Sequence, residues 1–79
     1  MLEDYVWKAV DLLGKMEQLR EILLQSDLPD HLNGAKVMLD DHNHFKKSIV
    51  RAPVEQMDME GNRILERICG ANRLNYHAG

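Results

Sequence analysis

The feature that most constrains the fold is a heptad repeat over residues 2–25. Apolar side chains recur at alternating steps of three and four residues, at Leu2, Tyr5, Ala9, Leu12, Met16, Leu19 and Leu23. In an α-helix this spacing brings all of these side chains onto one seam. More apolar residues widen the seam, at Val6, Val10, Leu13, Ile22 and Leu24. We therefore predict one helix over residues 2–25 that packs against more than one neighbour.

Size and composition restrict the chain to one small domain of 79 residues with a mostly aliphatic core. The net charge of −3 and the lack of a strongly basic segment argue against nucleic acid as a partner. No apolar run approaches the ~20 residues of a membrane span, and the N-terminus lacks a signal-peptide pattern. Cys69 is the single cysteine, so no internal disulfide is possible. We expect a cytoplasmic domain excised from a larger protein.

The segment Ser26-Asp27-Leu28-Pro29-Asp30 ends the first helix. Pro29 cannot continue that helix, but it suits the first turn of a second one, which Asp27 can cap. The loop has only three or four residues. Such a short connection makes the two helices antiparallel neighbours.

Residues 30–69 continue the apolar spacing across Pro53. Proline removes a backbone donor and biases Ala52 away from helical angles, so either a kink or a turn is possible there. Because no Gly or Asn is present to make a tight reversal, we predict one long helix over 30–69, bent near 51–54. The fold class is then all-α, an antiparallel helical hairpin. The alternative is a short three-helix bundle in which residues 54–69 fold back.

The predicted packing seam combines both helices of this module, which spans residues 1–69. In the second helix it comprises Leu32, Ala35, Leu39, His42, Phe45, Ile49, Val54, Met57, Ile64 and Ile68. Met38 and Gly61 also fall near this spacing. After Ile68 the pattern stops, and we expect residues 70–79 to be a frayed tail or a linker.

The order of motifs between Leu28 and Ile68 resembles a spectrin repeat. The matching pieces include Leu28-Pro29, Gly34-Ala35, Ala52-Pro53-Val54 and Glu60-Gly61. They are most similar to the first spectrin-like repeat of the Trio and kalirin family of Rho guanine-nucleotide exchange factors. The resemblance implies helices A and B of such a repeat, without helix C. It also implies that nucleotide exchange belongs to a separate domain.

The residues that bear reactive groups do not form a catalytic or metal-binding pattern. His42 and His44 lie two residues apart and point to opposite sides of a helix, so they cannot share a metal. Asp41 and His44 form one i, i+3 pair, which supplies too few ligands. Cys69 lies near a helix C-terminus, where the dipole disfavours a thiolate. We expect no catalytic residue, no metal, no cofactor and no small-molecule substrate.

The predicted function is therefore non-catalytic protein–protein interaction and spacing within a Rho exchange factor or a related signalling scaffold. Two helices with wide apolar stripes each leave one side exposed. We expect the isolated chain to bind partner helices or to self-associate as a dimer. The alternative is a small self-associating helical regulator that is unrelated to spectrin repeats.

Overall fold

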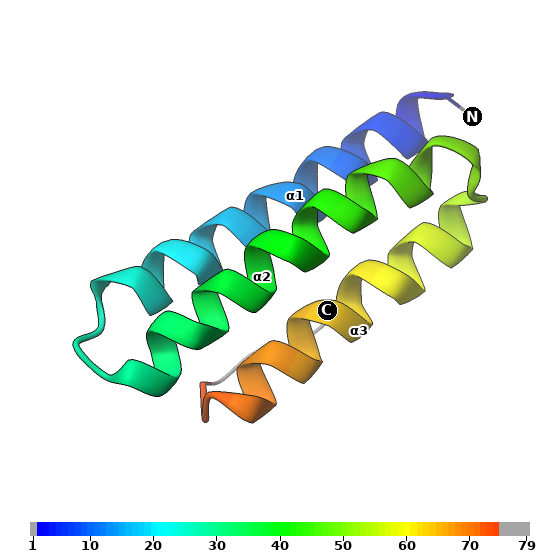
Figure 1. Cartoon of the computed structure of the whole chain (residues 1–79). Helices are drawn as coiled ribbons and strands as arrows, with labels where there is room; N and C mark the ends of the chain where they lie inside the picture. The colour runs from blue at the N-terminus through cyan, green and yellow to red at the C-terminus, as the bar shows by residue number, and fades with distance from the viewer. Residues whose placement is uncertain (1, 75–79) are drawn as a thin grey trace.

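The computed structural model describes the backbone of residues 2–74 and the side chains of residues 3–74. The fold is all-α. Helix α1 spans Leu2–Gln25, α2 spans Pro29–Ser48, a short 3-10 helix η1 spans Ile49–Arg51, and α3 spans Val54–Ala71. The helices α1 and α2 run antiparallel, and α3 turns back to lie beside both of them (Figure 1).

The turn between α1 and α2 forms where the sequence predicts it, although its cap differs. Pro29 occupies the first turn of α2, and its fixed φ angle suits that position. The N-cap residue is Leu28, in extended conformation, and no side chain caps the helix. Asp27 is therefore not the cap. Instead, the Ser26 hydroxyl accepts a hydrogen bond from the Leu28 N–H at 3.2 Å, which fixes the start of the turn.

The single helix predicted over 30–69 is wrong, because the chain reverses at Pro53. Ala52 (φ −92°, ψ 144°) and Pro53 (φ −62°, ψ 155°) are both extended. Proline disfavours helical angles in the residue before it, and Pro53 is itself extended, so two consecutive extended residues separate η1 from α3. This reversal needs neither glycine nor a positive φ angle. The alternative three-helix bundle matches the observed arrangement.

The core of the bundle is aliphatic and contains one aromatic ring. Its largest fully buried side chains are Leu12, Met16, Leu23, Met38, Phe45, Met57 and Leu65. Burying a side chain of this size contributes about 1.5–3 kcal/mol. The helices α1 and α3 approach closely at Gly61, where a β-carbon would lie 2.7 Å from Leu12 Cδ1. A larger residue at this position would force the buried side chain of Leu12 to shift.

The C-terminal end of α3 extends beyond the predicted limit at residue 69. Gly70 remains helical, and the helix ends at Ala71 with Asn72 as its C-cap. The Asn72 side-chain amide donates to the Ile68 carbonyl at 2.8 Å. Arg73 then adopts a left-handed conformation with φ 58°. Leu74 packs against the core. Residues 70–74 therefore belong to the bundle, and the rest of the predicted tail, 75–79, lies outside the described residues.

Candidate functional site

A surface of aliphatic and polar side chains runs along α1 and α2, on the side that α3 does not cover. On α1, each residue of this surface comes directly after a buried or partly buried residue in the sequence. On α2, the residues of this surface recur at alternating steps of four and three. The groove comprises Val6, Val10, Leu13, Glu17, Arg20 and Leu24 of α1 with Leu32, Lys36, Leu39, Asn43, Lys46 and Val50 of the chain around α2. We call this surface the α1/α2 groove. A shift of one residue rotates a side chain by about 100°, which moves it from the core to the edge of the helix.

One part of the α1/α2 groove is hollowed. A cavity of about 280 Å³ is lined by Arg20, Leu24, Leu32, Ala35, Lys36 and Leu39. Leu24, Leu32 and Leu39 are 46%, 41% and 38% exposed. At the other end of the groove, the Tyr5 hydroxyl donates a hydrogen bond to the Ile49 carbonyl and holds the two helices together. The cavity and the Tyr5 hydrogen bond thus lie at opposite ends of the α1–α2 pair.

Within the described part of the chain, His42 of α2 is the buried polar residue, with 8% of its surface exposed. Burial lowers the pKa of His42, because it disfavours the charged imidazolium. The positive charges of Lys46 and Arg20 lower this pKa further, whereas the negative charge of Glu17 raises it. The neutral ring is thus the stable form in the folded chain.

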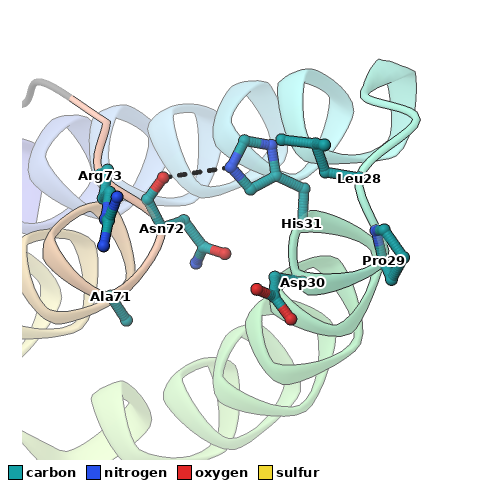
Figure 2. A pocket seen from close by; sticks show the side chains of 7 residues that line it. All are labelled: Leu28, Pro29, Asp30, His31, Ala71, Asn72 and Arg73. Atoms are coloured by element: carbon teal, nitrogen blue, oxygen red, sulfur yellow. Dashed lines mark hydrogen bonds between the residues drawn. The ribbon is translucent and has the colours of Figure 1, made fainter.

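A second, more polar cavity lies where the start of α2 meets the end of α3 (Figure 2). It has a volume of about 490 Å³ and is lined by Leu28, Pro29, Asp30, His31, Ala71, Asn72 and Arg73. The His31 ring bridges two segments, with Nδ1 2.8 Å from the Ser26 hydroxyl and Nε2 3.1 Å from the Asn72 carbonyl. Because both ring nitrogens already have partners, His31 ties the ends of the helices together.

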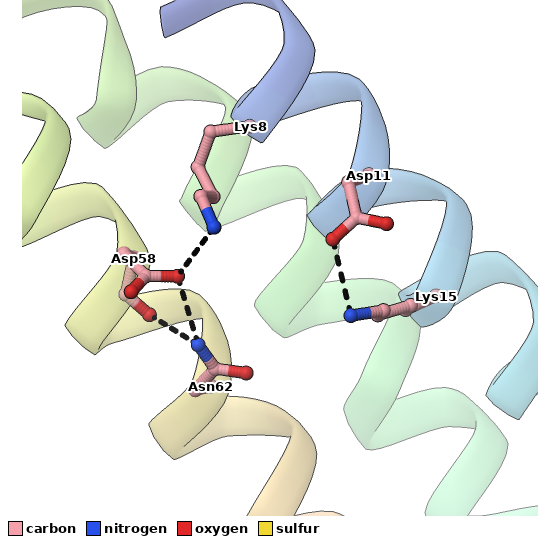
Figure 3. A network of polar contacts seen from close by, with 5 residues as sticks. All are labelled: Lys8, Asp11, Lys15, Asp58 and Asn62. Atoms are coloured by element: carbon pink, nitrogen blue, oxygen red, sulfur yellow. Dashed lines mark hydrogen bonds and ion pairs between the residues drawn. The ribbon is translucent and has the colours of Figure 1, made fainter. Parts of the chain in front are cut away.

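A polar network joins α1 to α3 on another side of the bundle (Figure 3). The Lys8 ammonium lies 3.3 Å from the Asp58 carboxylate, which also accepts a hydrogen bond from Asn62 at 3.0 Å. Lys15 pairs with Asp11 at 3.1 Å within α1. These pairs are about 40–50% exposed. Solvent-exposed pairs contribute about 1 kcal/mol at most, so this network orients α3 more than it stabilises the fold.

The single cysteine has the environment of a core residue. Cys69 is 4% exposed and packs in the hydrophobic core. Burial raises the pKa of the Cys69 thiol above its ordinary value. Since the thiolate is the nucleophilic form, a buried thiol with a raised pKa is a poor nucleophile.

The structure divides the predicted seam residues into three groups. Eleven are buried: Ala9, Leu12, Met16, Leu19, Leu23, Ala35, His42, Phe45, Ile49, Met57 and Ile68. Three are partly buried against the core: Tyr5, Val54 and Ile64. Leu32 and Leu39 lie instead in the exposed α1/α2 groove, and the side chain of Leu2 lies outside the described residues.

Besides Gly34 and Gly61, sequence reasoning left three buried side chains out of the seam. Met38 and Leu65 are 0% and 1% exposed, and Cys69 is 4% exposed. On α2, the spacing through Ala35, Met38, His42 and Phe45 follows the buried face. The prediction mixed this stripe with the neighbouring one, which contains Leu32 and Leu39. Both stripes have the same period, so the spacing alone did not separate them.

No family model matches the sequence, and no solved structure matches the fold. Within residues 2–74, no group of three or more His, Cys, Asp or Glu side chains is placed to hold a metal ion. In the same part of the chain, none of the helices is long and apolar enough to cross a membrane.

Proposed function

We propose that this chain is a protein–protein interaction and spacer module that acts by helix packing and performs no catalysis. The observation that carries this proposal is the α1/α2 groove. The bundle already buries a core on its other side, so the groove residues are not needed to close the fold. Aliphatic side chains that line a groove between two helices are typical of surfaces that bind a further helix.

The charges of the groove also favour binding to a protein. Glu17, Arg20, Lys36 and Lys46 alternate with the aliphatic residues. Mixed charges around an apolar centre give orientation and specificity to a helical partner. A rigid elongated bundle, with principal extents of 42 × 23 × 15 Å, is also suited to separate the segments that flank it.

In its narrower form, the proposal assigns the module to a cytoplasmic Rho exchange factor or a related signalling scaffold. It is supported by the ordered match of residues from Leu28 to Ile68 to a spectrin-like repeat. The turn at Pro53 favours the second candidate, a small self-associating helical regulator unrelated to spectrin repeats. In a spectrin repeat helix B would continue through this position, whereas here α3 folds back.

Photocrosslinking in cells tests the interaction function. A benzophenone amino acid replaces Val10, which is 57% exposed in the groove, or Met59, which is 63% exposed on the outer face of α3. We expect protein adducts, with a second copy or with another protein, to form predominantly at position 10. Equal yields at both positions, or no adduct at position 10, would contradict the proposal.

The narrower assignment has its own test, which is the sequence of the full-length transcript. If the module belongs to an exchange factor, the same polypeptide encodes a Rho nucleotide-exchange domain. A complete open reading frame without such a domain would leave the small regulator as the remaining candidate.

A further inference from the structure

The C-terminal end of α3 forms a turn that its own sequence does not favour. The Arg73 N–H donates to the Gly70 carbonyl at 3.3 Å. The Leu74 N–H donates to the Cys69 carbonyl at 2.8 Å. These two bonds define a Schellman motif, in which the left-handed residue is usually glycine. Here that residue is Arg73, with φ 58°. Because a side chain disfavours left-handed angles, contacts from outside the turn must hold it in place.

The backbone carbonyl of Asn72 is the point where this turn meets α2. The helix α3 ends at Ala71, and Asn72 is its C-cap, with φ −106° and ψ 8°. In an unbroken α-helix, each carbonyl accepts a hydrogen bond from the N–H four residues further along. The Asn72 carbonyl instead lies 3.1 Å from Nε2 of His31 (Figure 2). The ring thus satisfies one of the carbonyls that the end of a helix leaves without an intrahelical partner.

The His31 ring is itself held by the turn between α1 and α2. Its Nδ1 lies 2.8 Å from the Ser26 hydroxyl, which also accepts a hydrogen bond from the Leu28 N–H. Since a carbonyl oxygen only accepts hydrogen bonds, Nε2 must carry a proton in order to bond to Asn72. In the neutral ring Nδ1 is then the acceptor, and the Ser26 hydroxyl donates to it. The two bonds therefore fix both the tautomer and the orientation of the ring.

Gly34, one turn after His31 on α2, gives the Asn72 side chain its place. A β-carbon at Gly34 would lie 2.7 Å from the Asn72 side-chain amide. The missing β-carbon leaves room for this amide, which donates to the Ile68 carbonyl at 2.8 Å. The first two turns of α2 thus contact both the carbonyl and the side chain of Asn72. The end of α3 is therefore held by a segment that lies far away in the sequence.

We propose that His31 is a latch that determines where α3 ends. The ring occupies the Asn72 carbonyl, which is the acceptor that a longer helix would use, and so holds Arg73 in its left-handed conformation. When the latch opens, residues 72–74 lose the turn, and their backbone returns to the helical angles that these non-glycine, non-proline residues favour. The latch sets the length of α3. This inference goes beyond the proposed interaction function and does not depend on the α1/α2 groove.

A matched pair of substitutions tests which bond of the ring matters. The side-chain nitrogen of glutamine takes roughly the place of Nε2 of histidine, whereas that of asparagine takes roughly the place of Nδ1. His31→Gln therefore retains a donor for the Asn72 carbonyl, and His31→Asn removes it. The matched control is His44→Asn, because His44 is exposed on the same helix.

Nuclear magnetic resonance of the whole chain reads out the turn. A positive φ angle brings the amide and α-protons of one residue close together, so Arg73 should show a strong Overhauser effect between them. His31→Asn should weaken this effect and speed hydrogen exchange of the Leu74 amide by about fivefold to tenfold, as expected for one lost hydrogen bond. His31→Gln and His44→Asn should stay within about twofold of the wild type. The Leu65 amide, in the middle of α3, should exchange as in the wild type and exclude general unfolding.

A second variant tests the link to the left-handed residue. Arg73→Gly removes the conformational cost of a positive φ angle, because glycine adopts such angles readily. In the double variant His31→Asn/Arg73→Gly, the exchange of the Leu74 amide should therefore return toward the wild-type rate. Exchange as fast as in His31→Asn alone would contradict a latch that acts by holding Arg73.

Three further results would overturn the latch. If His31→Asn leaves the Arg73 Overhauser effect and the Leu74 exchange unchanged, the packing of Leu74 against the core holds the turn without His31. Equal losses in His31→Asn and His31→Gln would show that the bond to the Asn72 carbonyl is not the cause. In nitrogen-15 spectra of the neutral ring, a proton on Nδ1 in place of Nε2 would also contradict the latch. Crosslinking at position 10 does not involve these residues, so the latch and the proposed function can fail separately.

Discussion

The two sides of the α1–α2 pair have the same helical spacing but different surroundings. On the side that faces α3, Leu12, Met16 and Leu23 are at most 1% exposed. On the other side, Val6, Val10 and Leu24 follow core positions by one residue and are 46–57% exposed. The difference arises from the turn at Pro53, which brings α3 to one side only. A heptad pattern therefore defines the helix, whereas the connection determines which stripe becomes the core.

The largest expected difference between the two sides is in the cost of removing a side chain. Leu12→Ala should lower the free energy of unfolding by about 2–5 kcal/mol, because it leaves a cavity in the core. Val10→Ala in the groove should change it by only about 0.5 kcal/mol. Urea denaturation at a protein concentration low enough to keep the chain monomeric measures both values. Similar losses for the two variants would mean that the groove is part of the core.

A smaller effect is expected where α3 touches the buried side of α1. Gly61→Leu introduces a side chain where Leu12 atoms lie 2.7–3.1 Å from the position of a β-carbon. Such overpacking should lower the free energy of unfolding by about 1–3 kcal/mol. Thermal unfolding of the variant measures the loss. An unchanged or raised melting temperature would show that α3 does not approach α1 at this point.

Gly14 provides the counterpart on the exposed part of α1. No atom lies within 4 Å of the position of a β-carbon there, and the residue is in the interior of the helix. Gly14→Ala should therefore raise the free energy of unfolding by about 1 kcal/mol, through helix propensity alone. If the same denaturation experiment shows a loss, another group must occupy the space beside Gly14.

The smallest expected effect is the dependence of stability on pH, because it depends on the protonation of one side chain, His42, at the boundary between the two sides. Burial lowers the pKa of His42 below the ordinary value of 6.5 that it has in the unfolded chain. The unfolded chain therefore takes up the proton first. The stability that comes from neutral His42 is present above this ordinary value and is lost as the pH falls toward the lowered pKa of the folded chain.

The comparison of wild type with His42→Gln isolates this contribution. Between about pH 7.5 and about pH 5.5, the melting temperature of the wild type should fall more steeply than that of the variant. Other histidines and carboxylates titrate in both proteins and cancel in the difference. Parallel curves would contradict a buried neutral His42.

The sequence was sufficient for the features that depend on local patterns. The heptad repeat predicts residues 2–25 as a helix, and α1 covers this range. Pro29 predicts the first turn, since it fits only the start of a helix. The turn at Pro53 was harder to predict, because a kinked helix and a reversal both satisfy the local rules for proline.

The candidate site was less accessible to sequence reasoning than the fold. Leu32 and Leu39 were predicted in the packing seam, and both lie in the groove. Met38 lies in the core, although it falls between these two positions in the sequence. Adjacent stripes of a helix differ by one residue and share one period. Only the position of α3 determines which of them is buried, and that position depends on contacts between distant parts of the chain.

The most direct test of the account is one distance between α1 and α3. In nuclear Overhauser spectra of the isotopically labelled wild-type chain, we predict strong contacts between the Leu12 methyl groups and the Gly61 α-protons, because Leu12 fills the space beside Gly61. Residues 52 and 53 should show extended chemical shifts. If these contacts are absent and helical shifts continue without a break from 48 to 57, α3 does not fold back and the account is wrong.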